Sequence, residues 1–221
     1  KTPKLLWSGT NLKDLPKIED FPNEFVIKPS KGFSANNVLC LVDGRNILDG
    51  SNWDYDKIIN QLDSNKFLKR VKPSWMVEEL LSPEPWREDE VIPRDWKFYC
   101  FGGEIVLIHA VLRLSTIDKK KNIHHYFTPD LRQIKRRIMI SRAVPEEPLF
   151  FPDCWDEMVI QVKKVGSKLN CFMRIDMYAT AEGPVFGEFT PTPEGGSGFT
   201  EGDYIGVTAY TTDFGGANTG S

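Results

Sequence analysis

Short apolar runs recur along the chain, and residues that favour turns, such as Gly, Pro, Asn and Ser, separate them. Runs of this length with such boundaries are typical of β-strands. The small and polar residues 30–37 join the first two runs into a hairpin, and Gly102-Gly103 join two later runs into a central antiparallel pair. The pattern predicts strands at 25–29, 38–42, 75–81, 96–101, 105–112, 171–179 and 185–190.

Two stretches carry apolar residues at helical spacing instead. One helix is predicted from residue 53 to about residue 70, where Pro73 ends the pattern. A second helix is predicted over 152–170, with Asp153 as its N-cap. The polar and basic segment 115–142, which includes His124-His125, is expected to be a loop or an exposed lobe.

The composition describes a folded, water-soluble protein. Of 221 residues, 40% are hydrophobic and 27% are charged, and no apolar run is long enough to cross a bilayer or to act as a secretory signal. A cytoplasmic location is therefore expected. The net charge of -3 argues against a general nucleic-acid binder, which needs a basic surface. The four cysteines are widely spaced in apolar neighbourhoods and are interpreted as buried free thiols: Cys40, Cys100, Cys154 and Cys171.

The last two predicted strands carry acidic residues that can meet. Alternation along a hairpin places Arg174 and Asp176 on one face, and Glu188 and Thr190 project together in the same way. Carboxylates that face each other across strands need a cation, and hard oxygen ligands suit Mg²⁺ shared with substrate phosphates. An equally weighted alternative is that both acids are solvated or pair with arginines.

Two further segments suggest a nucleotide site. Lys28 ends a strand just before a loop of small residues that includes Lys31, Gly32 and Ser34, and backbone N–H groups there can close over phosphates. Residues 76–81 form an apolar strand that turns acidic, an edge suited to adenine and ribose. Each feature alone also fits an ordinary hairpin loop and an ordinary core strand.

The order of these features resembles the ATP-grasp superfamily. The resemblance rests on Val-Ile-Lys-Pro at 26–29, Glu-Glu-Leu-Leu at 78–81, Arg-Ile-Asp at 174–176 and Glu188 before a Pro/Gly loop. Asp-Trp-Lys-Phe at 95–98, Gly-Glu-Phe-Thr at 187–190 and Gly195-Gly196 are similar to the TupA-like branch, which is associated with teichuronopeptide and capsular polysaccharide biosynthesis.

The resemblance implies an α+β ATP-grasp fold with two lobes of antiparallel sheet, packed helices and a nucleotide cleft between the lobes. The lobes are expected at 1–82 and 83–221, without the usual preceding domain. ATP and Mg²⁺ are the implied cofactors. The resemblance implies phosphate contacts from Lys28, Lys31, Gly32, Ser34 and Lys97, an adenine border at Glu78, Glu79, Leu80 and Leu81, metal ligands Asp176, Glu188 and Thr190, and a catalytic Arg174.

The implied function is an ATP-dependent ligase that joins a carboxylate to an amine or thiol through an acyl phosphate, in the modification of cell-surface polysaccharide or peptide. Arg113, at the end of a predicted strand, is a further candidate for meeting the substrate or the γ-phosphate. Thr190 stands where many ATP-grasp ligases have Asn, so a second Mg²⁺ would be held less tightly.

Three alternatives remain open at this stage. An ATP-grasp kinase would phosphorylate a hydroxyl acceptor, a catalytically reduced module would bind nucleotide or glycan, and an interaction protein would have no nucleotide site. Only about two dozen residues precede the first predicted strand. The chain is therefore interpreted as a fragment, a minimal member, or one whose acceptor site is completed by a partner protein or a homodimer.

Overall fold

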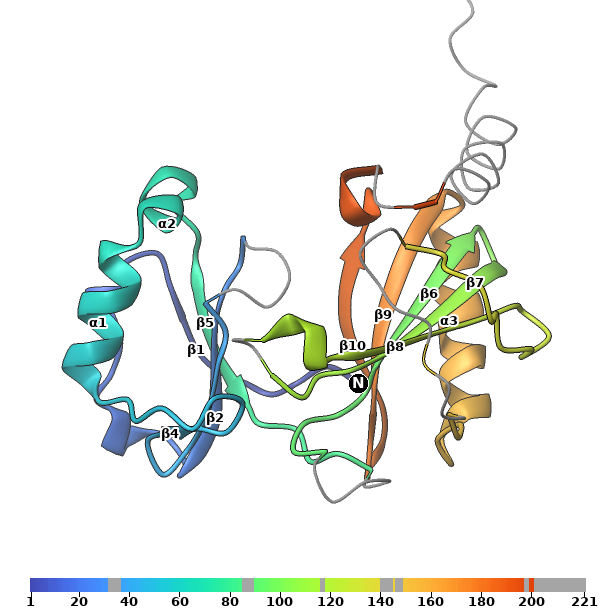
Figure 1. Ribbon diagram of the computed structural model, residues 1–221. Helices are drawn as coiled ribbons and strands as arrows, with labels where there is room; N and C mark the ends of the chain where they lie inside the picture. Colours follow the sequence, from blue (N-terminus) through green and yellow to red (C-terminus); the bar gives the residue numbers. More distant parts are fainter. Residues whose placement is uncertain are drawn as a thin grey trace, which may run out of the picture. The chain divides into compact units, whose positions relative to one another are not determined.

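The computed structural model describes residues 1–31, 37–84, 90–115, 118–139, 145, 149–196 and 199–200. The chain divides into two compact units, each built around its own antiparallel sheet (Figure 1). The smaller unit comprises Thr2–Ser82 and Leu114–Lys121. The larger unit comprises Lys1, Pro83–Arg113 and Asn122–Ser221. Two antiparallel sheets with packed helices agree with the α+β class that the sequence predicts.

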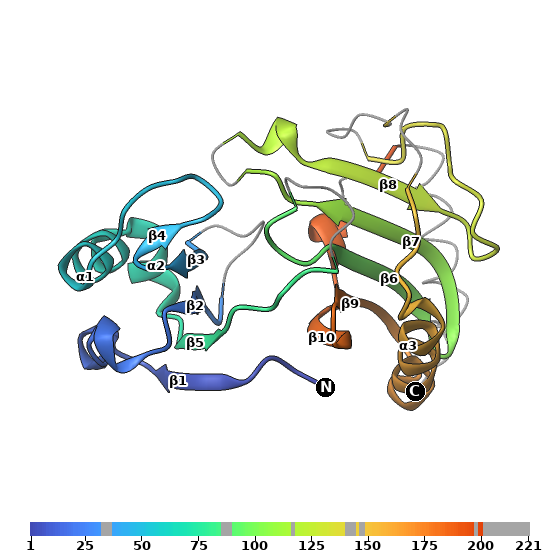
Figure 2. The same ribbon diagram turned by 90° about the horizontal axis from the view of Figure 1, so that it is seen from below.

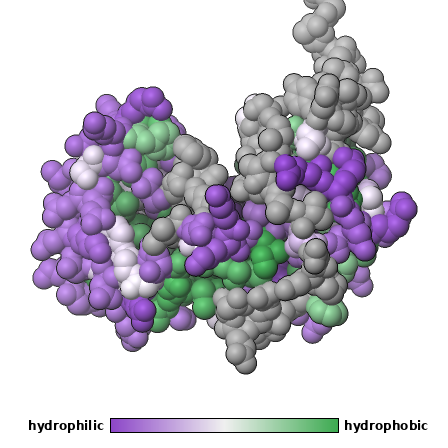
Figure 3. Space-filling view, in the orientation of Figure 1, coloured by the Kyte–Doolittle hydropathy of each residue, from purple (hydrophilic) through white to green (hydrophobic). Residues whose placement is uncertain are grey.

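The smaller unit contains a sheet in the order β1-β5-β2-β3-β4. Its strands are β1 (Leu5–Gly9), β2 (Glu24–Pro29), β3 (Leu39–Val42), β4 (Arg45–Asn46) and β5 (Trp75–Glu79), with two short 3-10 helices, η1 (Leu12–Asp14) and η2 (Ile18–Asp20). Helices α1 (Tyr55–Ser64) and α2 (Lys66–Val71) pack on the sheet through Ile58, Leu62 and Leu68. The outward surface over α1 is mainly hydrophilic (Figure 3).

The single helix predicted from residue 53 to about residue 70 is wrong, because Asn65 divides it. Asn65 has an extended backbone (φ -65°, ψ 116°), and its side-chain oxygen accepts hydrogen bonds from the backbone N–H groups of Phe67 (3.0 Å) and Leu68 (3.2 Å). This is an N-cap that starts α2. The apolar spacing continues across the break, which is why the two helices resemble one in the sequence.

The larger unit contains a sheet in the order β10-β9-β6-β7-β8. Its elements are β6 (Asp95–Phe101), β7 (Glu104–Leu112), β8 (Ile123–Phe127), α3 (Trp155–Leu169), β9 (Phe172–Thr180), β10 (Gly183–Thr190) and the 3-10 helix η4 (Pro193–Gly196). Another 3-10 helix, η3 (Lys119–Lys121), belongs to the smaller unit. Helix α3 lies along one face of the sheet (Figure 2).

Alternation along the strands gives this sheet two different faces. One face presents Trp96, Phe98 and Ile175 to Met158 and Val162 of α3, and these residues are buried in one core. Because adjacent residues point to opposite faces, Asp95, Lys97 and Asp176 lie on the other face. The apolar packing therefore fixes the strands on which the polar side chains stand.

Helix α3 approaches the β6–β7 turn closely at a glycine. A Cβ on Gly166 would lie 2.1 Å from the carbonyl oxygen of Gly102, which is closer than atoms can come without a shift. A larger residue would therefore push α3 away from the sheet. The helix ends at Asn170, which adopts the left-handed conformation (φ 48°) typical of a helix C-terminus.

Several details of the sequence prediction are wrong. Residues 123–127 of the predicted loop form β8, and the predicted loop histidines, His124 and His125, are buried in this strand. The N-cap of α3 is Cys154 without a side-chain hydrogen bond, not Asp153. Cys171 is exposed and Cys154 is only partly buried, although all four cysteines were expected to be buried.

The sequence prediction also misses the first strand of the chain, because its first predicted strand, 25–29, corresponds to β2. β1 (Leu5–Gly9) lies at the edge of its sheet and pairs with β5, and two of its five residues are exposed. Among the described residues, no helix is long and apolar enough to cross a membrane.

Candidate active site

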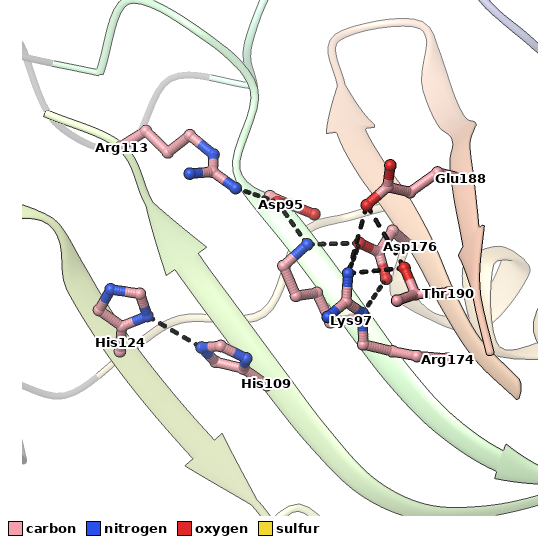
Figure 4. A network of polar contacts seen from close by, with 9 residues as sticks. All are labelled: Asp95, Lys97, His109, Arg113, His124, Arg174, Asp176, Glu188 and Thr190. Atoms are coloured by element: carbon pink, nitrogen blue, oxygen red, sulfur yellow. Dashed lines mark hydrogen bonds and ion pairs between the residues drawn. The ribbon is translucent and has the colours of Figure 1, made fainter. Parts of the chain in front are cut away.

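The polar face of the larger sheet carries a row of side chains that the strand register aligns. Glu188 of β10 is the Cα partner of Asp176 of β9, which pairs with Lys97 of β6. The row continues through His109 of β7 to Tyr126 of β8. Residues that pair in this way project to the same face, so acids, a lysine and a histidine lie side by side (Figure 4).

Arg174 and Asp176 form a bidentate ion pair next to the middle of this row. Nε of Arg174 donates to Oδ1 of Asp176 (2.7 Å), and Nη2 donates to Oδ2 (2.8 Å). Burial by itself lowers the pKa of Arg174, but the hydrogen bonds and the charge of Asp176 outweigh burial and raise it. The guanidinium is therefore fixed as a cation in a buried position.

Lys97 is shared between two carboxylates. Its ammonium contacts Oδ2 of Asp176 and lies 2.7 Å from Oδ2 of Asp95. Arg113, at the end of β7, contacts the same Asp95 oxygen at 3.0 Å. Burial raises the pKa of Asp95, but the charges of Lys97 and Arg113 outweigh burial, and the pKa is lowered.

Glu188 and Thr190 complete the network on β10. Oε1 of Glu188 accepts a hydrogen bond from Nη2 of Arg174 (3.2 Å), and the Thr190 hydroxyl accepts one from the same nitrogen (2.8 Å). The Glu188 side chain is 63% exposed. Its pKa is raised, first by desolvation and then by the negative charge of Asp176.

A bulge in β10 sets the position of Glu188. The register shifts between Phe186 and Glu188, and Gly187 lies at the shift. A Cβ on Gly187 would lie 3.0 Å from the Tyr178 ring and 3.1 Å from the carbonyl oxygen of Asp176. Glycine therefore allows β10 to stay close to β9 where Glu188 comes opposite Asp176.

The oxygens of this hairpin have the chemistry that Mg²⁺ requires. Oε2 of Glu188 has no hydrogen-bond partner within the part of the chain that the structure describes, and desolvation and the charge of Asp176 raise the pKa of Glu188. The described residues include no group of three or more His, Cys, Asp or Glu side chains arranged around a metal position. Two carboxylates with substrate phosphates are a usual Mg²⁺ environment, so the hairpin fits this ion.

The predicted nucleotide-site residues of the smaller unit have contacts of their own. Lys28 of β2 forms an ion pair with Glu78 of β5 at 2.5 Å, and both side chains are largely buried. Glu79 accepts a hydrogen bond from the backbone N–H of Lys4 (2.8 Å). Leu80 and Leu81 follow β5 and are half-buried. Lys31 is exposed, and Gly32 and Ser34 lie outside the described residues.

The structure connects six of the predicted site residues into one network in the larger unit. These are Lys97, Arg113, Arg174, Asp176, Glu188 and Thr190. Sequence reasoning missed Asp95 as a member, although it lies two residues before Lys97 and alternation places both side chains on one face. That spacing was the signal that could have identified it.

Sequence reasoning also missed a buried histidine pair beside the network. Nε2 of His109 and Nδ1 of His124 are 2.9 Å apart, and the ring of His109 stacks on Tyr126 with centroids 4.3 Å apart. His109 is the register neighbour of Lys97. The polar composition around His124 concealed the strand that brings it there.

Comparison with known proteins finds one family and several similar folds. A family model described as TupA-like ATPgrasp matches residues 6–205. Two structures of D-alanine–D-alanine ligase from Bacillus anthracis are similar, each with a TM-score of 0.51. The one complexed with ATP is 14% identical and the match covers 95% of this chain and 55% of that one; for the other the values are 16%, 98% and 57%.

The similarity to the two ligases is one of structure. At such identities the solved structures establish a shared fold, and the chain spans little more than half the length of either ligase. No curated protein matches the sequence.

Proposed function

The chain belongs to the TupA-like ATP-grasp family, and from this membership we propose that it is an ATP-dependent ligase that activates a carboxylate as an acyl phosphate. An amine or a thiol then captures the acyl group, which gives an amide or a thioester. The observation that carries the proposal is the network of Lys97, Arg174, Asp176 and Glu188 on one face of the larger sheet.

The chemistry explains why such a network is needed. A carboxylate is a poor electrophile because oxide is a poor leaving group, and phosphorylation supplies a better one. Phosphoryl transfer depends mainly on positioning and on neutralising the charge of the phosphate oxygens. Arg174 donates two hydrogen bonds to Asp176, so its guanidinium is already oriented for this task.

Each charged residue has a proposed role. Arg174 stabilises the transferring phosphoryl group and the acyl phosphate, and Lys97 and Arg113 contact phosphate or substrate oxygens. Asp176 and Glu188 would hold Mg²⁺, with the Thr190 hydroxyl as a weaker third donor. When bound, the ion supplies positive charge against the phosphates of ATP.

The smaller unit is proposed to bind the rest of the nucleotide. Lys28 and Lys31, with the backbone at Gly32 and Ser34, would contact phosphates, and Glu78, Glu79, Leu80 and Leu81 would border the adenine. Family membership supports these roles. A setting in cell-surface polysaccharide or peptide modification, with a partner or a second copy completing the acceptor site, is part of the same proposal.

The experiment compares the wild type with the double variant Asp176→Asn and Glu188→Gln. ADP release from Mg-ATP is measured with a panel of small carboxylates and amines, and we expect the double variant to lose at least about 100-fold of the wild-type rate. Asp156→Asn, an exposed change on α3, is the matched control and keeps the full rate. Undiminished ADP release by a folded double variant would remove the metal assignment.

The identity of the product separates the remaining alternatives. An amide or thioester supports the ligase, whereas a stable phosphorylated hydroxyl product identifies a kinase. ATP binding without turnover with any acceptor identifies a binding module. Failure of Mg-ATP to raise the melting temperature at concentrations far above a micromolar dissociation constant excludes a nucleotide site.

A further inference from the structure

The ammonium of Lys97 occupies the centre of the carboxylate cluster. The side chains of Lys97, Asp95 and Asp176 are 8%, 4% and 2% exposed, so this lysine is a buried cation between two buried acids. Its position follows from the register, which makes Lys97 the partner of Asp176, and from alternation, which places Asp95 on the same face.

The cations of the network leave Asp176 little capacity for another ligand. Arg174 donates to both oxygens of Asp176, and Lys97 also contacts Oδ2. Three carboxylates, Asp95, Asp176 and Glu188, are matched by Lys97, Arg113 and Arg174. A divalent cation that binds Asp176 must compete with an ammonium that is already in contact.

We propose that Lys97 is an internal counter-ion for the metal-binding carboxylates, and that it disfavours divalent cations until nucleotide phosphates draw its ammonium away. A phosphate is a strong acceptor for an ammonium, so the triphosphate can replace Asp176 as the partner of Lys97. The cation then binds together with the nucleotide and not before it. The inference rests on the proposed function for the identity of the nucleotide.

Asp95 gives Lys97 a second place of attachment. One Asp95 oxygen contacts both Lys97 and Arg113, while the other is buried and has no hydrogen-bond partner among the described residues. Asp95 therefore keeps the ammonium near the cluster and stays paired with Arg113 when Lys97 moves. Without Lys97, Arg113 and Arg174 would face three carboxylates, and the surplus negative charge would attract a divalent cation.

The test measures Mn²⁺ binding in the absence of nucleotide, by isothermal titration calorimetry. We expect Lys97→Met to bind Mn²⁺ at least about tenfold more tightly than the wild type, because a unit positive charge in contact with both carboxylates is removed. Lys97→Arg keeps the charge and should bind Mn²⁺ as weakly as the wild type. Lys164→Met removes an exposed lysine on α3 and should leave Mn²⁺ binding unchanged.

A second measurement covers the case in which the variant is unstable. Mn²⁺ should raise the melting temperature of Lys97→Met, or of Lys97→Gln if that variant folds better, and leave the wild type unaffected at the same concentration. In the wild type, Mn²⁺ with a non-hydrolysable ATP analogue should bind at least about tenfold more tightly than Mn²⁺ alone.

The outcomes separate this inference from the proposed function. Equal Mn²⁺ affinity of the wild type and Lys97→Met, or an equal gain in Lys97→Arg, would overturn the counter-ion role whatever the nucleotide does. If the ATP analogue fails to bind the wild type, the proposed function is lost, and the Mn²⁺ comparison between the variants still decides the role of Lys97.

Discussion

Two carboxylates on the polar face have opposite electrostatic surroundings. Asp95 is buried against Lys97 and Arg113, and its pKa is lowered. The pKa of Glu188 is raised instead, first by desolvation and then by the negative charge of Asp176. Two cations thus contact Asp95, whereas a single cation, Arg174, contacts Glu188 among the described residues. A group of the second kind is the one expected to meet a ligand.

Asp95 should make a pH-dependent contribution to stability. Its folded-state pKa lies below the unfolded value of about 3.9, so the stabilisation is present above pH 4 and is lost as the pH falls through the folded-state value. We expect Asp95→Asn to lower the free energy of unfolding at pH 7 by about 3 kcal/mol, because Lys97 and Arg113 lose a buried partner. Urea unfolding at pH 7, 5 and 3 measures this difference.

The deficit of the variant should shrink between pH 5 and pH 3. Asp156→Asn serves as the control, since its side chain is exposed at the start of α3 and no comparable deficit is expected. A deficit that stays constant over this range would mean that packing of Asp95, and not its charge, stabilises the fold.

The sequence predicted part of the residue-scale arrangement. Alternation on a hairpin was enough to expect Asp176 and Glu188 to meet across strands, and the register makes them partners. The two interpretations of this hairpin were a shared cation, or acids that are solvated or pair with arginines. The structure shows that Arg174 pairs with both acids and that Glu188 is mostly exposed, and the cation belongs to the proposal. The His109–His124 contact depends on β8, so it was not predictable without that strand.

At the scale of elements, prediction succeeded for most apolar strands and for the edge strand β10, and it missed β1, β4 and β8. β6 and β9 are buried core strands and were predicted to within one residue at each end. β8 follows Lys119-Lys120-Lys121 and contains His124-His125, so its neighbours concealed its burial. The division of α1 from α2 depends on the conformation of Asn65, which apolar spacing does not report.

The close approach of α3 to the sheet should make Gly166 intolerant of any side chain. Alanine favours a helix by about 1 kcal/mol over glycine, but a Cβ at this position would lie 2.1 Å from the Gly102 oxygen. We expect Gly166→Ala to lower the free energy of unfolding by about 1–3 kcal/mol, the usual effect of overpacking. Guanidinium unfolding of the wild type and the variant measures the change.

Lys164→Ala, on the exposed side of the same helix, is the control and should change stability by no more than about 0.5 kcal/mol. If Gly166→Ala stabilised the protein, helix propensity would outweigh the contact, and α3 would have room to move relative to the β6–β7 turn. The residues of the polar network lie on strands against which α3 packs. The loss of stability in Gly166→Ala therefore also measures how much this packing stabilises those strands.

At the scale of the whole molecule, the sequence predicts less. The two sheets follow from strand patterns within each unit, but alternation and register act only between paired strands. They carry no information on how the Lys28–Glu78 pair of one unit acts together with the Lys97 network of the other. Joint action of these residues was suggested by the family resemblance, and it stays a prediction.

The charge of the molecule leads to the last prediction, which is that nucleotide binding requires a divalent cation. The net charge is -3, and the cations of the polar network are already balanced by Asp95, Asp176 and Glu188. ATP alone would therefore add four negative charges to a site without surplus positive charge, whereas Mg-ATP adds about half of that.

We expect Mg-ATP at about 100 times its dissociation constant to stabilise the protein by about 2.7 kcal/mol. For a chain of this size, each kcal/mol of stabilisation raises the melting temperature by roughly 2–4 °C. ATP with excess EDTA should give a much smaller shift, and MgCl₂ alone should give almost none. An equal shift with and without the metal would show that the lysines and arginines neutralise the phosphates unaided, and that Asp176 and Glu188 do not hold a cation.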